Sequence, residues 1–273
     1  MYAQYWGLQL LPFENTPDPR FFYASPQHQE GLARLKYVVE GRKGAGVLTG
    51  VFGCGKTLLA RSLLRDLPSS RYRVAYIANP LMSELELLHG IALKLNVTGL
   101  PDRRSELLKD VVLESIGRRL QENARDGKDT LVLIDEAHVL QDERVVEELR
   151  LLLNFQDEER FFLTLLLMGQ PELRELVDRN KPLAQRICMG YHLVPLSEQE
   201  TAAYVTYRLR VAGASEPVAV FSAGAMRLLF ESSGGIPRRI NQLADVAMLE
   251  GMSKNAKHID EPVLQEAMQS LGV

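Results

Sequence analysis

The sequence has few cysteines, a single tryptophan and no long uninterrupted apolar run. Its two cysteines, Cys54 and Cys188, stand far apart and lack the spacing of metal ligands. We therefore expect reduced thiols in a cytoplasmic protein, and neither a disulfide scaffold nor a zinc site. No apolar run approaches the roughly 18 residues that a membrane-spanning helix needs. No membrane span is expected.

A strong excess of either charge is also absent. The net charge is −3 over 273 residues, with 46% hydrophobic residues, which is ordinary for a soluble globular protein. A strongly electrostatic nucleic-acid binder is not indicated, although a local basic face stays possible. The N-terminus lacks a basic segment followed by a long apolar core, so no secretory signal is expected.

Proline and aromatic residues gather in residues 1–26, which favours an extended N-terminal arm lying on a domain. From there to residue 196, short apolar segments alternate with helical patterns. Strands are predicted at residues 46–50, 72–78, 129–135, 161–168 and 191–197. Helices are predicted at residues 27–42, 56–66, 83–95, 104–125 and 142–156. This order predicts an α/β fold, a five-stranded parallel sheet with helices on both faces.

After residue 196 no strand candidate is evident. Ser197 followed by Glu200 has the form of a capping box that opens a helix. Helical patterns continue to the end of the sequence, at residues 221–232, 237–252 and 260–271. We therefore predict three parts: the arm at 1–26, an α/β core at 27–196, and a small all-helical domain at 197–273.

Residues 50–57, GVFGCGKT, match the phosphate-binding pattern G-x4-G-K-[ST] between an apolar strand and a helix. The loop amides and the helix N-terminus would face phosphate oxygens. Lys56 would reach the β- and γ-phosphates, and the Thr57 hydroxyl would hold Mg²⁺. A glycine-rich turn that binds nothing is the alternative, which the context disfavours. The predicted nucleotide contacts are Gly50, Val51, Phe52, Gly53, Cys54, Gly55, Lys56, Thr57 and Leu58.

The segment LVLIDE, residues 131–136, delivers two carboxylates at the end of an apolar strand, where ligands of such sheets bind. Asp135 would hold Mg²⁺ through water, and Glu136 would polarise an attacking water as general base. A solvated acidic turn is the alternative. The letters DEAH do not indicate a helicase, because the chain is too short for two motor domains. His138 is expected to form local hydrogen bonds, with a catalytic role as the alternative.

Two further polar residues stand where a phosphate could be sensed. Gln170 ends the fourth predicted strand, beside the strand of Asp135, and could position the water or sense the γ-phosphate. Arg186 precedes the fifth strand and could reach a neighbouring subunit's nucleotide to stabilise the transferring phosphoryl group. For Gln170, the alternative is a simple turn at the end of the strand. For Arg186, the alternative is a surface ion pair, and Arg174 and Arg179 are competing candidates for the arginine that reaches the neighbouring nucleotide.

The segment GGIPRRIN, residues 234–241, starts a helix in the small domain, with Pro237 at its first turn. Arg238 could fold back onto the γ-phosphate and couple the two domains to the nucleotide state. An arginine that only opens the helix is the alternative.

Together these motifs resemble those of AAA+ P-loop ATPases, and in particular the ExeA/GspA-like ATPases of the general secretion pathway. The resemblance rests on PFENTPDPRFFY (12–23), LTGVFGCGKT (48–57), GQPEL (169–173), QRI (185–187) and GIPRRIN (235–241). It implies ATP and ADP binding with Mg²⁺, ATP hydrolysis, homo-oligomers in a ring or helical filament, and a helical lid. It marks as functional Lys56, Thr57, Asp135, Glu136, Gln170, Arg186 and Arg238.

The resemblance also implies that the arm lies near the adenine, with Phe13 and Tyr23 as candidate pocket walls. The chain departs from the family pattern at two loop positions. The family usually has Glu where Val51 stands and a small hydroxyl residue where Cys54 stands. Because backbone amides do most of the phosphate binding, nucleotide binding should survive both changes.

Three functions fit this sequence to different degrees. The first is an ATP-driven oligomer that remodels or positions an unidentified protein partner, for which a bacterial envelope or secretion machine at the inner face of the membrane is one candidate setting. The second is a DNA-associated regulator that assembles on double-stranded DNA, as related transposition regulators do. A small-molecule P-loop kinase is disfavoured, because Glu136 suits water activation. Arginines available for a DNA-binding patch are Arg71, Arg73, Arg103, Arg104, Arg208 and Arg210.

Overall fold

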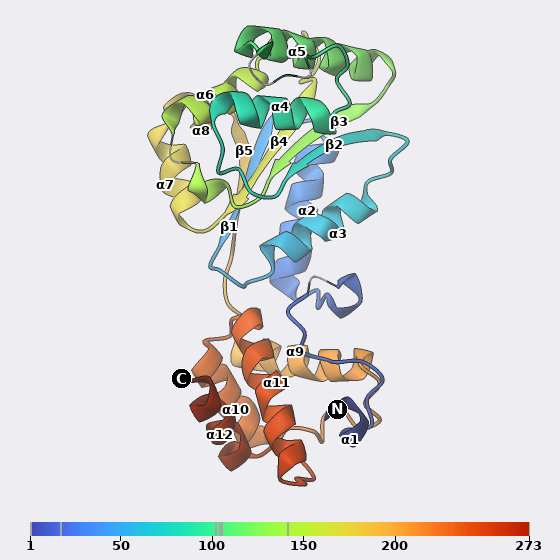
Figure 1. The fold of residues 1–273 in the computed structure, drawn as a ribbon, viewed down its shortest axis with the longest axis vertical. Coiled ribbons are helices and arrows are strands. Elements are labelled where there is room, and N and C mark those ends of the chain that lie inside the picture. The colour runs from blue at the N-terminus through green and yellow to red at the C-terminus, as the bar shows by residue number, and fades with distance from the viewer. Residues whose placement is uncertain (1, 17, 102, 104–105, 141, 273) are drawn as a thin grey trace. The chain divides into compact units, whose positions relative to one another are not determined.

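The computed structural model describes residues 2–16, 18–101, 103, 106–140 and 142–272 (Figure 1). Arg104 lies outside this range. The chain forms two compact units. The first, which we call the sheet unit, comprises His28–Val51 and Leu59–Leu193. The second, the helical unit, comprises Met1–Gln27, Phe52–Leu58 and Val194–Val273.

Five parallel strands form one sheet in the order β2-β3-β4-β1-β5, so the predicted α/β fold is confirmed. Their bounds are β1 Ala45–Gly50, β2 Tyr72–Ile77, β3 Asp129–Ile134, β4 Leu163–Gly169 and β5 Ile187–Leu193. The three central strands are buried along their whole length, which explains their continuous apolar sequences. β5 lies at the edge, and its residues alternate between more and less exposed positions.

Helices cover both faces of the sheet (Figure 1). On one face, side chains from α4, α5 and α6 form a core with β1, β3 and β4. On the other face, Val38 of α2 packs against the backbone of Gly46 in β1. The helices connected with the strands are α2 Pro26–Glu40, α3 Lys56–Asp66, α4 Glu84–Lys94, α5 Lys109–Arg125, α6 Glu143–Leu152, α7 Glu172–Arg179 and α8 Lys181–Ala184.

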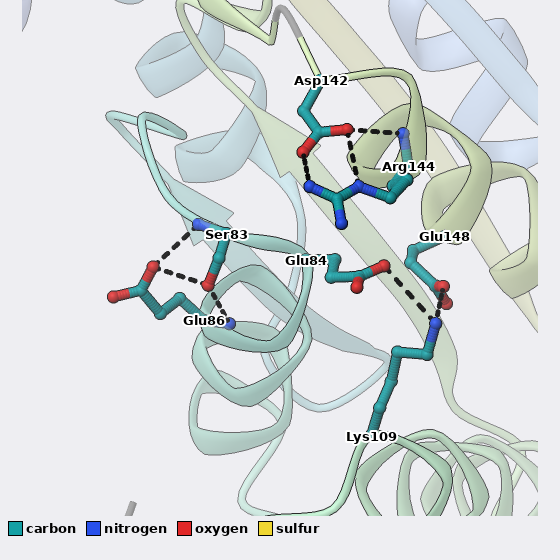
Figure 2. A network of polar contacts seen from close by, with 7 residues as sticks. All are labelled: Ser83, Glu84, Glu86, Lys109, Asp142, Arg144 and Glu148. Carbon is teal, nitrogen blue, oxygen red and sulfur yellow. Dashed lines mark hydrogen bonds and ion pairs between the residues drawn. The ribbon is translucent and has the colours of Figure 1, made fainter.

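Polar contacts connect the starts of α4 and α5 with the middle of α6 (Figure 2). Ser83 and Glu86 form a complete capping box at the start of α4. The ammonium of Lys109, at the start of α5, lies 3.4 Å from Glu84 on α4 and 2.8 Å from the buried Glu148 on α6. Lys109 therefore links α5 to both α4 and α6 on this face of the sheet.

The helical unit contains α9 Glu198–Val211, α10 Ala223–Ser233, α11 Pro237–Ser253 and α12 Glu261–Leu271. The capping box predicted from Ser197 and Glu200 is present at α9. The arm belongs to the same unit and is not simply extended. It includes a short helix, α1 Tyr2–Tyr5, and a 3-10 turn, η1 Pro19–Phe21, because aromatic residues there bury themselves in the helical core.

Long-range hydrogen bonds hold the arm on this core. The indole N–H of Trp6 donates to the carbonyl of Met248 at 2.9 Å. Arg208, which is only 5% exposed, donates to the carbonyls of Pro12 and Glu14 in the arm. Within the described ranges, none of the helices has the length and apolar character needed to cross a bilayer.

Candidate functional site

Three neighbouring strands end with chemistry-bearing residues at one edge of the sheet. β4 lies between β1 and β3, and both pairings are parallel. Gly50 closes β1, Asp135 directly follows β3, and Gln170 directly follows β4. Parallel strands bring their carboxyl ends to the same edge, where ligands of α/β sheets bind. The predicted position of Gln170 beside the strand of Asp135 is confirmed.

The phosphate loop, residues 50–57, turns on two glycines with left-handed backbones. Gly53 has φ 88° and Gly55 has φ 95°, a region that residues with a Cβ rarely adopt. A Cβ on Gly53 would also lie only 2.9 Å from the Cβ of Arg238. α3 starts at Lys56, so the amides of its first turn follow the loop directly. A glycine turn that leads into a helix N-terminus is the arrangement that binds phosphate.

The side chains of the loop differ in burial. Lys56 is 4% exposed and Cys54 is 1% exposed, whereas Phe52 is exposed. Burial raises the pKa of the Cys54 thiol to about 11, and the charge of Lys56 opposes this only in part. The thiol is therefore neutral at pH 7 and fills space as a small apolar group. Thr57 is the second residue of α3 and is half-buried.

Arg238 contacts the phosphate loop in two ways. Its backbone N–H donates to the carbonyl oxygen of Gly53 at 3.4 Å. Its guanidinium carbon lies 4.3 Å from the centre of the Phe52 ring, in a cation–π arrangement. Pro237 occupies the first position of α11, which sets the start of the helix that carries Arg238. Both contacts lie within the helical unit and join α11 to the loop.

Asp135 is held in place from two sides. It is 2% exposed. Its Oδ1 accepts the backbone N–H of Glu136 at 2.9 Å, and its Oδ2 accepts the hydroxyl of Tyr76 on β2 at 3.1 Å. Burial, with the neighbouring charge of Asp135, raises the pKa of Tyr76 to about 12. Tyr76 therefore remains a hydrogen-bond donor to this carboxylate at neutral pH.

Glu136 begins the short 3-10 helix η3 Ala137–Val139 from a left-handed backbone conformation, with φ 53°. For a residue with a side chain, this conformation is uncommon and strained. Its Oε2 lies 3.4 Å from Nδ1 of His138. The amide nitrogen of Gln170 donates to Nε2 of the same imidazole at 2.9 Å. As predicted, His138 forms local hydrogen bonds, and it lies between two other predicted site residues.

Arg186 directly precedes β5 and is bound to the end of α6. Its guanidinium donates to the carbonyl of Leu153 at 2.7 Å and to Oδ1 of Asn154 at 2.8 Å. The competing arginines are engaged on α7. Arg174 pairs with Asp178 at 3.1 Å, and Arg179 donates to the carbonyl of Glu175. A role of Arg186 at a neighbouring subunit would therefore require release of both of its contacts.

The two aromatic candidates of the arm pack against other aromatic residues of the helical unit. Phe13 is 2% exposed and meets Phe221 edge-on, with ring centres 6.2 Å apart. Tyr23 lies 5.9 Å from Tyr204 and 5.6 Å from Tyr207, between ring centres. Phe13 therefore contributes to the core of the helical unit, while Tyr23 is only partly buried and keeps accessible ring surface.

The predicted basic patch is wrong for Arg208. Its guanidinium is buried among arm carbonyls and the ring of Phe21, so it cannot contact DNA phosphates. Arg71 forms an ion pair with the buried Asp129 at 2.9 Å. Arg103 is exposed near Glu106. The remaining described arginines do not by themselves define a DNA-binding face.

The residues present suit a nucleotide with Mg²⁺. Loop amides and Lys56 are typical phosphate ligands, and the oxygens of Thr57 and Asp135 are the ligand type that Mg²⁺ prefers. In the described part of the chain, no three His, Cys, Asp or Glu side chains gather into a metal-binding group. Mg²⁺ usually keeps several waters and phosphate ligands and takes one or two protein ligands, a role for which Thr57 and Asp135 have the right oxygen atoms.

Sequence reasoning missed Tyr76 and the stacking of Arg238 on Phe52. Tyr76 stands opposite Leu133 of β3, so its contact with Asp135 depends on the pairing of β2 with β3. Sequence spacing alone contains no signal for this pairing. The presence of an aromatic residue, Phe52, inside the phosphate loop was the one sequence signal for a stacking partner there.

Comparison with known proteins gives one family and several relatives. A family model described as "AAA domain" matches residues 39–177. General secretion pathway protein A of Aeromonas hydrophila is 40% identical over 262 residues, which cover 95% of this chain and 46% of the relative. An uncharacterized HTH-type transcriptional regulator of Methanocaldococcus jannaschii is 30% identical over 146 residues, covering 52% of this chain and 35% of the relative. The chain thus spans less than half the length of these curated relatives.

Solved structures with the same fold are more distant in sequence. Drosophila ORC bound to DNA has a TM-score of 0.73 at 18% identity, covering 100% of this chain and 66% of that chain. Cdc6p from Pyrobaculum aerophilum has a TM-score of 0.71 at 17% identity, covering 93% and 70%. The RuvB branch migration motor of Thermotoga maritima has a TM-score of 0.57 at 19% identity, covering 89% and 69%. These similarities confirm the fold, and the relatives confirm the resemblance to ExeA/GspA-like AAA+ ATPases.

Proposed function

Because the chain belongs to the AAA domain family, we propose that it binds ATP with Mg²⁺ and hydrolyses it to drive its own assembly. The assembly then remodels or positions a protein partner. The observation that carries this proposal is the double contact of Arg238 with Phe52 and Gly53 of the phosphate loop. It gives the lid a direct connection to the segment that binds phosphate in this family.

The proposed phosphate contacts come from the loop and the start of α3. Backbone amides of residues 50–57 and the buried ammonium of Lys56 hold the phosphate oxygens. Mg²⁺, held by Thr57 and through water by Asp135, would neutralise the charge that develops on the phosphates. Tyr76 and the N–H of Glu136 keep the carboxylate of Asp135 in one orientation for this task.

The proposed hydrolysis uses water as the nucleophile. Glu136 accepts a proton from the water as general base, and Gln170 orients the water or the γ-phosphate through its amide. Arg238 exchanges its stacking on Phe52 for an ion pair with the γ-phosphate, which couples the lid to the nucleotide state. Arg186 of a neighbouring copy stabilises the transferring phosphoryl group, after leaving Leu153 and Asn154.

We also propose that residues 1–26, 27–196 and 197–273 act as arm, ATPase core and lid. The arm lies on the lid helices through Arg208 and Trp6. Through this attachment, Tyr23 is the arm residue that remains a candidate wall for an adenine pocket. Phe13 takes part indirectly, by packing beneath the arm. The cytoplasmic location, at the inner face of the membrane through a partner, stays a prediction.

Relatives suggest two classes of partner. The general secretion pathway relative favours a protein partner in a bacterial envelope system. A DNA-associated regulator is the second candidate, favoured by the HTH-type regulator among the relatives. The burial of Arg208 removes one of the arginines that DNA binding would use.

The test measures ATP hydrolysis and particle mass by light scattering, with ADP and with ATP, in the presence and absence of double-stranded DNA at several salt concentrations. We expect ATP-dependent assembly and turnover without DNA. Lys56→Ala should lose turnover, whereas the exposed control Lys257→Ala should keep both assembly and turnover. Assembly that requires DNA and weakens steeply with salt would favour the regulator instead. Absence of ATP turnover under all conditions would refute the enzymatic proposal.

A further inference from the structure

His138 connects the two polar groups that act on water in the proposed mechanism. It contacts Gln170 through Nε2, at 2.9 Å, and Glu136 through Nδ1, at 3.4 Å. The three side chains come from the ends of β3 and β4 and from η3, all within the sheet unit. One imidazole therefore lies between the candidate base and the candidate phosphate sensor.

The strand end leaves room for this ring. A Cβ built on Gly169, the last residue of β4, would lie 3.0 Å from the backbone nitrogen of His138 and 3.2 Å from its Nδ1. A side chain at position 169 would therefore push the imidazole out of place. The absence of a side chain at Gly169 is what allows His138 to lie between its two contacts.

The contact with Gln170 determines which ring nitrogen carries the proton. An amide nitrogen is a donor only, so Nε2 of His138 accepts and is unprotonated. The proton of the neutral ring is then on Nδ1, which faces Glu136. Nδ1 is buried and makes no hydrogen bond of normal length, so Oε2 of Glu136, at 3.4 Å, is the acceptor within its reach. A small movement of the Glu136 carboxylate would complete this hydrogen bond.

Gln170 has a second amide N–H that His138 does not use. With the first N–H held by the imidazole, the amide cannot rotate freely, and its nitrogen side has a defined direction. A γ-phosphate oxygen or an attacking water can accept the second N–H without breaking the first contact. The same imidazole limits the positions available to Glu136.

The other charged groups around His138 are mostly acidic. The ring lines a cavity of about 830 Å³ between α6 and α7. The cavity carries Glu143 and Glu147 from α6, and Glu172, Glu175 and Arg179 from α7. Glu147 is paired with Arg150 at 2.6 Å. Gln170 lines the same cavity, so the contact between its amide and the imidazole lies at the cavity wall.

We propose that His138 is a positioning residue for ATP hydrolysis, which transmits the orientation of Gln170 to Glu136 through a neutral imidazole. This inference rests on the proposed ATPase function. The imidazole holds one N–H of the Gln170 amide, so the other N–H keeps its direction toward the phosphate or the water.

The test compares steady-state ATP hydrolysis of the full chain with that of His138→Ala, His138→Gln and the exposed control His258→Ala. We expect His138→Ala to lower kcat by roughly fivefold to tenfold, the size of one hydrogen bond lost from a transition state, with little change in KM. His138→Gln keeps a polar atom near the place of Nε2 and should retain more of the rate. His258→Ala should behave as the unchanged chain.

Two readouts separate positioning from a general structural effect. Loss of an orientation in the transition state should lower kcat and leave KM and nucleotide affinity nearly unchanged, whereas a general disturbance of the site should change all three. In a double-mutant cycle, Gln170→Ala should cost less in the His138→Ala background than in the unchanged chain, because part of its effect depends on the orientation that His138 provides. Thermal unfolding and fluorescent-nucleotide binding verify that each variant folds.

Each result has a defined meaning. Wild-type turnover by a folded His138→Ala, a change in KM and nucleotide affinity in place of kcat, or fully multiplicative effects in the cycle would overturn the role of His138. The proposed function would stand in those cases, as long as the unchanged chain hydrolyses ATP. If the unchanged chain does not hydrolyse ATP, the proposed function itself fails, and the inference fails with it.

Discussion

The guanidinium carbon of Arg238 lies 4.3 Å from the centre of the Phe52 ring, so an arginine of α11 lies on the phosphate loop itself. Phe52 is 55% exposed, and the stacked pair therefore lies at the surface of the helical unit. A γ-phosphate offers this guanidinium a stronger, charge-assisted partner than an aromatic ring. In the proposed cycle, Arg238 would therefore stack on Phe52 before ATP binds and would contact the γ-phosphate afterwards.

Arg238→Ala should weaken ATP binding relative to ADP binding. The lost contact is a charge-assisted hydrogen bond to the γ-phosphate, which ADP lacks, so we expect ATP affinity to fall by roughly tenfold or more while ADP affinity hardly changes. Calorimetric titration with ADP and with a non-hydrolysable ATP analogue measures the difference. Arg239→Ala, at the next and exposed position, is the matched control. An equal loss for both nucleotides would mean that Arg238 only shapes the loop.

Tyr76→Phe should raise the Mg²⁺ concentration needed for half-maximal ATP hydrolysis. The variant removes the hydroxyl that donates to Oδ2 of Asp135 and leaves that carboxylate less well oriented. The loss of one hydrogen bond to a charged group predicts an increase of roughly tenfold. Since the pKa of Tyr76 is raised to about 12, its contribution should be constant around neutral pH.

Tyr72→Phe provides the control on the same strand. The hydroxyl of Tyr72 is buried and has no hydrogen-bond partner, so its removal should change neither the Mg²⁺ dependence nor the folding of β2. If both tyrosine variants shift the Mg²⁺ dependence alike, the effect is a general disturbance of the strand.

Cys54 should resist thiol reagents in the folded protein. Its thiol is 1% exposed, and burial raises its pKa to about 11, so little of the reactive thiolate exists near neutral pH. Burial also raises the pKa of Cys188, but this residue is exposed and should react first. Labelling of Cys188→Ser with a maleimide, followed by mass spectrometry, should show slow modification that accelerates as the pH rises toward 11 and becomes complete on unfolding. Rapid labelling of the native variant at neutral pH would contradict the buried position of Cys54.

Arg186→Ala should lose ATP turnover while it still binds ATP, because the arginine acts on a neighbour's phosphate in the proposed assembly. Mixing it with Lys56→Ala should restore part of the activity. In a mixed assembly, an intact Arg186 from the Lys56 variant can face an intact site on the Arg186 variant. Turnover of the mixture at different ratios measures this rescue. No rescue from variants that still assemble would indicate that Arg186 only holds Leu153 and Asn154.

Much of the sheet could be predicted from the sequence, because central strands leave a clear signal. The buried strands β1, β3 and β4 have continuous apolar residues, and their ends are marked by Gly50, Asp135 and Gln170. The edge strand has no such signal. The fifth strand was predicted at residues 191–197 but extends over Ile187–Leu193. Because its residues alternate in exposure, they form no continuous apolar run that would mark the strand. Some of the apolar residues on which the prediction relied lie after the end of the strand.

Contacts between distant segments could not be predicted in the same way. The hydrogen bond from Gln170 to His138 joins residues 32 positions apart, and the bond from Tyr76 to Asp135 joins residues 59 positions apart. Both depend on which strands are neighbours and on their register. The burial of Arg208 by the arm is similar, because its carbonyl partners lie almost 200 positions earlier in the chain. Because arginine is usually exposed, its residue type alone predicts a surface position for Arg208.

Single-turnover hydrolysis by Glu136→Gln is the most direct test of the central claim that this chain is an ATPase with Glu136 as its base. The substitution keeps the size of the side chain and removes its ability to accept the proton from water. We predict that Glu136→Gln binds ATP as tightly as the unchanged chain but hydrolyses it at least 100-fold more slowly, about the contribution of a general base. Hydrolysis by Glu136→Gln at the unchanged rate would contradict this role.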